Sequence, residues 1–338
     1  MTISPLLRLA AVLLIGAGLT AAHPARAQDV YAGKEISIVL PTGPGGGWAF
    51  TAQLIAETMP KYIPGGPRIV PQFMPGASGV KMMNFLANAA PQDGTHLGLP
   101  LKDVATTQMM IAEARFDVRK FHWIGRVAPV RTTLVVWHTA PATTVAAARL
   151  AEVIFAAQGK SDQSSMNPLF MNAIAGTRFR VVTGYRGSAD AFLAMERGEA
   201  HGWSGAWDAT ASQRADWVRE KKLVPLVQLS LTRAPDLPDV PLLMEYATGE
   251  EQRSMVDFMT AGAEIGRSLI APPGVPAKNV AILRRAFAQA MTDEALIARA
   301  AKAKLAIEPL SGPEIATVVE KIVSIRPATL KKVEDAIR

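Results

Sequence analysis

The chain has 338 residues, a formal net charge of +7 and no cysteine. The missing cysteines exclude disulfides, thiol nucleophiles, cysteine-bound metals and a lipid-modified N-terminal cysteine. The basic residues form no run, which excludes the concentrated positive surface of a nucleic-acid-binding protein, and the length allows two domains.

The N-terminus has the pattern of an export signal. Arg8 precedes an apolar stretch from Leu9 to Leu19, and Ala25, Arg26 and Ala27 form an A-x-A cleavage pattern. We therefore expect residues 1–27 to be a signal peptide and the mature chain, beginning near Gln28, to be a freely soluble periplasmic protein. The apolar core is shorter than the roughly 20 residues of a membrane span, which counts against an uncleaved anchor.

The first half of the mature chain alternates between strand-like and helix-like segments. The predicted strands are Ile36–Leu40, Arg68–Phe73 and Thr95–Leu99, and the helices between them are Phe50–Met59 and Val80–Ala89. A βαβαβ order predicts a parallel sheet covered by helices.

A glycine-rich run, Pro41 to Trp48, joins the first strand to the first helix. Glycines let backbone N–H groups approach a ligand, and a helix N-terminus favours an anion, so this turn predicts a phosphate or carboxylate site. The run lacks the Lys of a Walker loop and the third glycine spacing of a dinucleotide fingerprint, so both nucleotide interpretations fail. The alternative is a plain turn between strand and helix.

The second half has the pattern of another α/β region. Strands are predicted at Leu134–Trp137, Phe179–Thr183, around Trp203 and at Leu223–Leu229, with a helix over Val145–Ala157. Together the two regions predict an exported, two-lobed binding protein whose ligand lies in the cleft between the lobes.

The C-terminal part is predicted to be helical. Val280, Leu283, Phe287 and Met291 form an apolar stripe at helical spacing, and the sequence from Ser311 to Glu314 matches a capping box. These features indicate core packing.

Several motifs, in the same order along the chain, resemble the substrate-binding proteins of tripartite tricarboxylate transporters, the Bug proteins. They are Ile38 to Pro41 with Gly45 to Gly47, Pro75 to Gly79, Pro91 to Thr95, Tyr185 to Gly187, Leu237 to Pro241, and Ala271 to Pro276. The resemblance implies an α/β fold of the Venus-flytrap type, two lobes that each contain a mainly parallel sheet flanked by helices. It also implies that residues 28–128 and 263–338 form the first lobe and residues 129–262 the second.

The same resemblance implies a periplasmic receptor that captures a small organic acid and delivers it to membrane transporter subunits, without catalysis. The implied ligand-binding residues of the first lobe are Gly46, Gly47, Trp48, Ala49, Ala77, Ser78 and Gly79. Those of the second lobe are Ser164, Ser165, Tyr185, Arg186, Trp203, Ser204 and Asp208. Ala49 departs from the family, which often has an aspartate there, so the identity of the ligand does not transfer.

Each polar or aromatic candidate also has a structural interpretation. Trp48, Trp203 and Trp207 could enclose an apolar ligand body or pack within their lobes. Arg186 could bind a distal carboxylate or form a surface ion pair, and Asp208 could contact the ligand or cap a helix.

No catalytic or metal-binding pattern is present, so we expect no enzyme activity, no cofactor and no metal. The histidines lack the spacing of a zinc site, and the candidate nucleophile elbow around Ser204 lacks its last glycine. The alternatives are a receptor that presents its ligand to a signalling sensor, and an exported serine hydrolase using Ser204 and His201. We expect a monomer that binds no nucleic acid.

Overall fold

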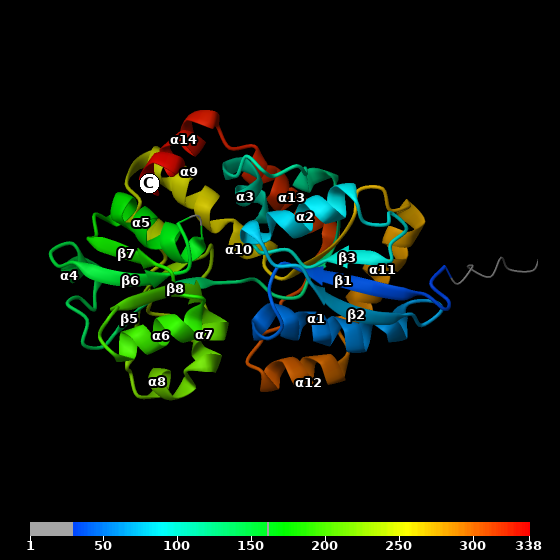
Figure 1. Ribbon diagram of the computed structural model, residues 1–338, viewed down its shortest axis with the longest axis horizontal. Coiled ribbons are helices and arrows are strands. Elements are labelled where there is room, and N and C mark those ends of the chain that lie inside the picture. Colours follow the sequence, from blue (N-terminus) through cyan, green and yellow to red (C-terminus); the bar gives the residue numbers. More distant parts are fainter. Residues whose placement is uncertain (1–29, 161) are drawn as a thin grey trace, which may run out of the picture.

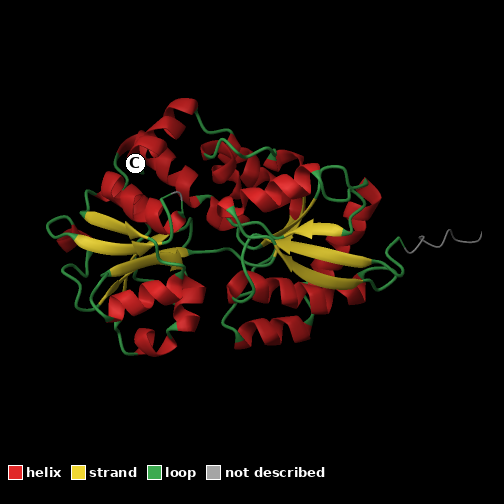
Figure 2. Ribbon diagram, in the orientation of Figure 1, coloured by secondary structure: helices red, strands yellow, loops and turns green. Residues whose placement is uncertain are grey.

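The computed structural model describes residues 30–160 and 162–338, so the predicted signal peptide lies outside the described residues. Two α/β lobes lie side by side, each with a central sheet covered by helices on both faces (Figures 1 and 2). We call the lobe with the six-stranded sheet the first lobe and the lobe with the five-stranded sheet the second lobe. This confirms the predicted two-lobed α/β fold.

The first lobe is built from both ends of the described chain. Its strands are β1 (Glu35–Leu40), β2 (Arg68–Phe73), β3 (His96–Gly98), β4 (His122–Arg126), β10 (Ser268–Ala271) and β11 (Leu310–Ser311). Its helices are α1 (Gly46–Thr58), α2 (Val80–Asn88), α3 (Val104–Met110), α11 (Ala277–Ala290), α12 (Glu294–Lys302) and α13 (Gly312–Val323). The short 3-10 turns η2 (Met59–Tyr62), η3 (Ala77–Gly79) and η4 (Val118–Lys120) complete it.

The second lobe comes from the middle of the chain. Its strands are β5 (Thr132–Trp137), β6 (Val153–Ala157), β7 (Phe179–Thr183), β8 (Gly202–Ala206) and β9 (Leu223–Leu229). Its helices are α4 (Val145–Ala148), α5 (Gln163–Ala175), α6 (Ser188–Glu196), α7 (Trp207–Gln213), α8 (Ala215–Arg219), η5 (Leu243–Tyr246) and α9 (Gly249–Thr260). Helix α10 (Gly262–Ile265) leads back to the first lobe, and α14 (Pro327–Ala336) ends the chain.

Both sheets are mixed, which corrects the expectation of mainly parallel sheets. Strand β1 pairs in parallel with β2 and β3, but β10 runs antiparallel to β3 and β4, and β11 antiparallel to β4. In the second lobe β6 is parallel to β7 and β8, whereas β5 is antiparallel to β8 and β9. Strands β4 and β5 flank the first crossing between the lobes, and β10 follows the return crossing. Because the chain leaves the first lobe through β4 and comes back through β10, these two strands run in opposite directions.

The predicted helix over Val145–Ala157 is wrong. The helix ends after Ala148, and Val153–Ala157 forms β6, in the interior of its sheet between β7 and β8. A strand that is buried on both faces shows a continuous apolar run rather than alternation, so the alanine-rich segment could not be distinguished from a helix by its pattern.

Packing follows the period of each element. In β1 the side chains of Ile36, Ile38 and Leu40 enter one apolar cluster, whereas Val39 enters the cluster on the opposite face. The stripe on α11 is buried as predicted, and α13 begins with the predicted capping box of Ser311 and Glu314.

Two antiparallel segments form the connection between the lobes. The N–H of Val127 donates to the carbonyl of Arg267, and the N–H of Arg267 donates to the carbonyl of Ala128, both at 2.9 Å. Next to them Arg131 donates to both carboxylate oxygens of Glu308 at 2.9 Å, and this contact lowers the pKa of Glu308. The connection is therefore held by backbone and charged contacts at once.

Candidate functional site

The first glycine loop presents an uncapped helix N-terminus. Gly45, the N-cap of α1, has φ of 94°, and Gly46 follows with φ of 71°, values in the region that favours glycine. No side chain caps α1, and its first turn contains no acidic residue. Among the residues described by the structure, the first N–H groups of this 13-residue helix thus have no side-chain acceptor, which is favourable for an anion.

A buried arginine lies against this loop. The side chain of Arg267 is only 1% exposed, and an added Cβ on Gly47 would lie 2.9 Å from its Nη2 atom. The guanidinium carbon lies 5.1 Å from the centre of the Trp48 ring, a cation–π distance. Trp48 is itself held by a 3.0 Å bond from its indole N–H to the carbonyl of Pro100.

Asp208 of the second lobe completes this group of residues. It lies in the first turn of α7, and its Oδ2 atom is 2.7 Å from Nη2 of Arg267. The N-cap of α7 is Ala206, so Asp208 does not cap the helix. The pair therefore links the second lobe to the underside of the first glycine loop.

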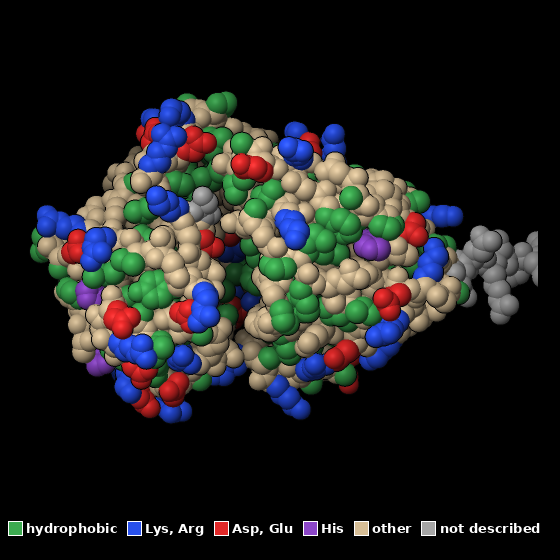
Figure 3. All heavy atoms as spheres, in the orientation of Figure 1, with side chains coloured by type: hydrophobic (Ala, Val, Ile, Leu, Met, Phe, Trp, Pro, Cys, Tyr) green, Lys and Arg blue, Asp and Glu red, His purple; other side chains and the backbone are tan. Residues whose placement is uncertain are grey.

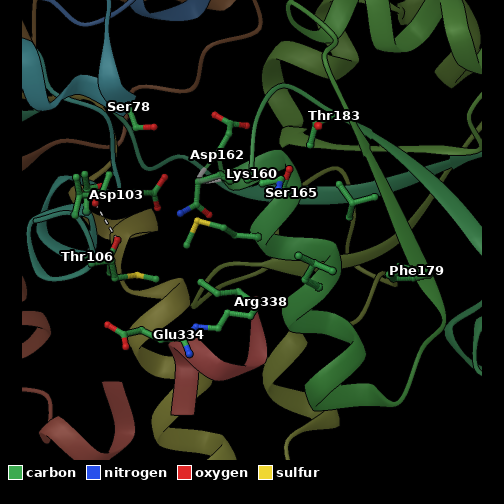
Figure 4. A pocket seen from close by; sticks show the side chains of 18 of the residues that line it. Ser78, Asp103, Thr106, Lys160, Asp162, Ser165, Phe179, Thr183, Glu334 and Arg338 are labelled. Atoms are coloured by element: carbon green, nitrogen blue, oxygen red, sulfur yellow. Dashed lines mark hydrogen bonds between the residues drawn. The ribbon is translucent and has the colours of Figure 1, made fainter. Parts of the chain in front are cut away.

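The second glycine loop follows β2 and has an unusual backbone. Ala77 and Ser78 have φ values of 46° and 49°, and the flanking glycines Gly76 and Gly79 are also positive. A left-handed conformation costs roughly 1–2 kcal/mol for a residue with a Cβ. Such strain is found preferentially at binding sites, and Ser78 here faces the space between the lobes (Figure 4).

The facing edge of the second lobe is the start of α5. Asp162 caps this helix by accepting from the N–H of Ser164 at 2.9 Å, and the Ser164 hydroxyl also donates to Asp162. The hydroxyl of Ser165 donates to the carbonyl of Gly159 at 2.6 Å. Both serines thus fix the loop between β6 and α5, while Ser165 also lines the interlobe cavity.

This cavity has a volume of about 950 Å³ and opens where the surface is hollowed between the lobes (Figure 3). Ser78 and Asp103 come from the first lobe, while Lys160, Asp162 and Ser165 lie across from Ser78 in the second (Figure 4). The lining also includes Thr106, Met110, Met166, Leu169, Arg178, Phe179, Arg180, Thr183, Glu334, Ile337 and Arg338. A mixture of hydroxyl, charged and apolar groups around a space of this size suits a small polar solute.

The predicted site residues do not gather at a single place. Ser78 and Ser165 line the cavity, and Gly47, Trp48 and Asp208 surround Arg267. Gly46 and Gly79 shape the loops, whereas Ala49 is buried and Ala77 contributes a strained backbone. Neither Tyr185 nor Arg186 lines this cavity.

The remaining candidates of the second lobe pack within it or face solvent. Arg186 is 89% exposed and pairs with Asp190 at 2.9 Å. Trp203 packs edge-on against Phe192 in the core, and the indole of Trp207 donates to Asp236 at 2.7 Å. These contacts correspond to the structural interpretations of these side chains.

Ser204 and His201 do not form the hydrogen bond that the serine hydrolase alternative requires. Ser204 Oγ accepts from the side chain of Asn167 at 3.0 Å, and Nδ1 of His201 faces the N–H of Ile154 at 3.0 Å. His201 and Ser204 are three positions apart, so on an extended strand their side chains point to opposite faces. Burial, followed by the nearby charge of Arg180, lowers the pKa of His201.

Sequence reasoning missed Arg267, Lys160 and the C-terminal residues. Arg267 lies alone between Gly266 and a β-strand, and no local pattern connects it to the glycine loop more than 200 residues earlier. Lys160 lies four residues before Ser164, the first predicted site residue of the second lobe, and this proximity is the signal that could have found it. Within residues 30–160 and 162–338, no group of His, Asp and Glu could hold a metal ion, and none of the helices is long and apolar enough to span a bilayer.

Comparisons with known proteins agree with this architecture. Residues 51–315 match the family model described as tripartite tricarboxylate transporter family receptor. No curated protein matches the chain.

Solved structures of similar fold cover nearly the whole described chain. A ligand-free TctC solute-binding protein from Polaromonas is 20% identical, with a TM-score of 0.66 over 90% of this chain and 99% of that one. An R. palustris protein solved with adipate is 19% identical, with a TM-score of 0.67 over 90% and 97%. MatC from Rhodopseudomonas palustris, solved with malate, is 20% identical, with a TM-score of 0.62 over 90% and 99%.

Proposed function

Because this chain belongs to the tripartite tricarboxylate transporter receptor family, we propose that it is a periplasmic receptor for a small organic acid. The acid is held between the two lobes and delivered to membrane transporter subunits, and the protein acts as a monomer without catalysis. The observation that carries this proposal is the interlobe cavity, in which Ser78 faces the start of α5 and Ser165.

The lobes that enclose the acid are proposed to divide near residues 129 and 262. This division is supported by the backbone pairing of Val127 and Ala128 with Arg267, which marks the crossing. Hinge motion at two short crossing segments can open and close such a cleft.

The basic side chains of the lining, Lys160 among them, favour an acid. Lys160 lines the cavity three residues before the start of α5, where its positive charge attracts an anion, whereas the N-terminus of α5 itself is already capped by Asp162. Adipate and malate, found in two proteins of the same fold, make dicarboxylic acids the first class to test.

The proposal predicts that one class of carboxylic acid stabilises the protein. Residues 28–338, unfolded and refolded to remove bound solute, should be titrated with mono-, di- and tricarboxylates and aromatic acids during thermal unfolding. An acid present at 100 times its dissociation constant should add about 2.7 kcal/mol to the free energy of unfolding.

Matched amides of the same acids are the control, because they keep the shape and lose the charge. Stabilisation by an acid but not by its amide supports the carboxylate receptor. The absence of any shift with every acid would contradict the proposal.

A further inference from the structure

We propose that Arg267 is the cationic anchor for the carboxylate of the solute, and that Asp208 occupies this anchor as an internal competitor when no solute is bound. This inference rests on the proposed function and names a charged residue at the first glycine loop. It also gives Asp208 a role opposite to that of a ligand contact.

The buried guanidinium of Arg267 lacks some of its hydrogen bonds, and an unsatisfied buried charge costs free energy. Its side chain is 1% exposed, yet its Nε and Nη1 atoms are buried without a hydrogen-bond acceptor in the part of the chain that the structure describes. The Oδ1 atom of Asp208 is likewise buried without a donor. Buried charged groups usually satisfy all their polar atoms, so a pair with three unsatisfied atoms is poorly optimised as a purely structural bridge.

The position of the guanidinium matches that of an anion site. Gly47 has no side chain, so Nη2 lies against the loop backbone, at the first turn of α1. A carboxylate in the place of Asp208 would therefore be next to the guanidinium. Charge-assisted bonds to a guanidinium are among the strongest polar contacts available to a carboxylate.

Trp48 lies between Arg267 and the segment that reaches the cavity at Leu101. One side of its ring faces Arg267, and its N–H bonds to the carbonyl of Pro100, the residue before Leu101 in the cavity lining. An acid with a second polar group could therefore place one end at Arg267 and extend towards the cavity past Trp48.

Of the two arginines near Asp208, Arg131 and Arg267, only Arg267 can bind a new anion. The hydrogen bonds with Glu308 are the main cause that raises the pKa of Arg131. The nearby negative charge of Asp208 makes a smaller contribution in the same direction. Both Nη atoms of Arg131 are already held by the Glu308 carboxylate. Within residues 30–160 and 162–338 the guanidinium of Arg267 has one ion pair, the one with Asp208, which the solute can replace.

Displacement of the Asp208 carboxylate by the solute would also couple binding to the arrangement of the lobes. Asp208 lies on α7 of the second lobe, whereas Arg267 directly precedes β10 of the first. When a solute carboxylate takes the guanidinium, this interlobe ion pair is broken and the lobes are free to settle around the solute.

The test is calorimetric titration of acetate, malate and adipate, with malamide and adipamide as uncharged matches, into four proteins. These are the mature wild type, Arg267→Gln, Asp208→Asn and the control Arg253→Gln, which removes an exposed arginine of α9. Arg267→Gln should weaken acid binding about tenfold or more and should reduce the preference for acids over amides. Asp208→Asn should tighten acid binding by about threefold to tenfold, because it removes a competing negative charge. The control should bind as the wild type does.

The outcomes separate this inference from the proposed function. If the wild type binds no acid, both are overturned. If Arg267→Gln binds acids as the wild type does, only the anchor is overturned, and if Asp208→Asn binds them more weakly, the competitor role is overturned. Should Arg267→Gln fail to fold, which urea unfolding will show, the opposite-direction effect of Asp208→Asn still decides.

Discussion

Single residues at the crossing between the lobes have tightly defined geometry. Gly266 has φ of 53° and ψ of −136°, and it directly precedes Arg267. A Cβ at this position would overlap the carbonyl oxygen of Ala128, which accepts the N–H of Arg267. One glycine therefore lets the two crossing segments pair and places Arg267 beneath the first loop.

We expect Gly266→Ala to lower the free energy of unfolding by about 3 kcal/mol or more, through backbone strain together with a backbone clash. Urea unfolding of the mature protein measures this loss. The matched control is Gly176→Ala, because Gly176 has φ of 69° but no atom near the added Cβ. It should cost about 1–2 kcal/mol, and equal losses in the two variants would show that the crossing is not sterically constrained.

At the scale of elements, helix ends connect parts of the chain that are distant in sequence. Asp293 caps α12 by accepting from the N–H groups of Ala295 and Leu296 at 2.9 and 3.1 Å. Its other oxygen accepts from Tyr62 at 2.9 Å and Lys61 at 3.0 Å, so the cap also fastens α12 to η2. These bonds, led by the one from Leu296, lower the pKa of Asp293 from 3.8 to about 2.

A lowered carboxyl pKa predicts the direction of a pH effect. The stabilisation by Asp293 is complete above the unfolded-state pKa of 3.8 and is lost as the pH falls towards about 2. Asp293→Asn should therefore be less stable than the wild type at neutral pH, and the difference should shrink as the pH is lowered through this window. Urea unfolding between pH 7 and pH 3 tests this, and a difference that does not change with pH would contradict it.

At the scale of the whole molecule, the two lobes are not independent. A single cluster of buried apolar side chains runs from Met83 and Val319 of the first lobe to Phe155 and Phe170 of the second. It also includes Val333 of α14, which packs against α5 and α9 beside the second lobe (Figure 1). The C-terminal helix thus leaves α13 in the first lobe and attaches to the second, where its end lines the interlobe cavity.

We expect that ending the chain after Arg326, which removes α14, destabilises the second lobe. The loss of the contacts of Val333 and Thr329 should cost about 2–3 kcal/mol and should speed hydrogen exchange in α5 and α9. Lys332→Gln is the control, because its pair with Glu251 is largely exposed and should contribute less than about 1 kcal/mol. Unchanged exchange in α5 and α9 would show that α14 does not support this lobe.

Much of the architecture could be predicted because it depends on local patterns. The strands around Ile36, Arg68, Phe179 and Leu223 and the capping box at Ser311 are determined by residues close together in the chain, as are the two glycine loops. The strand conformation of Val153–Ala157 is not determined by neighbouring residues, because its pairing partners β7 and β8 come later in the chain. The sequence therefore determined the two α/β halves and their glycine loops.

Only the tertiary structure decided which side chains meet at that cleft. The direction of β10, the pairing of Asp208 with Arg267 and the arrival of Arg338 at the cavity all join segments from different parts of the chain. Such contacts depend on how the chain crosses twice between the lobes. Side-chain period and turn chemistry describe neighbours along the chain, so they contain no information about which distant charge will lie beneath a given loop.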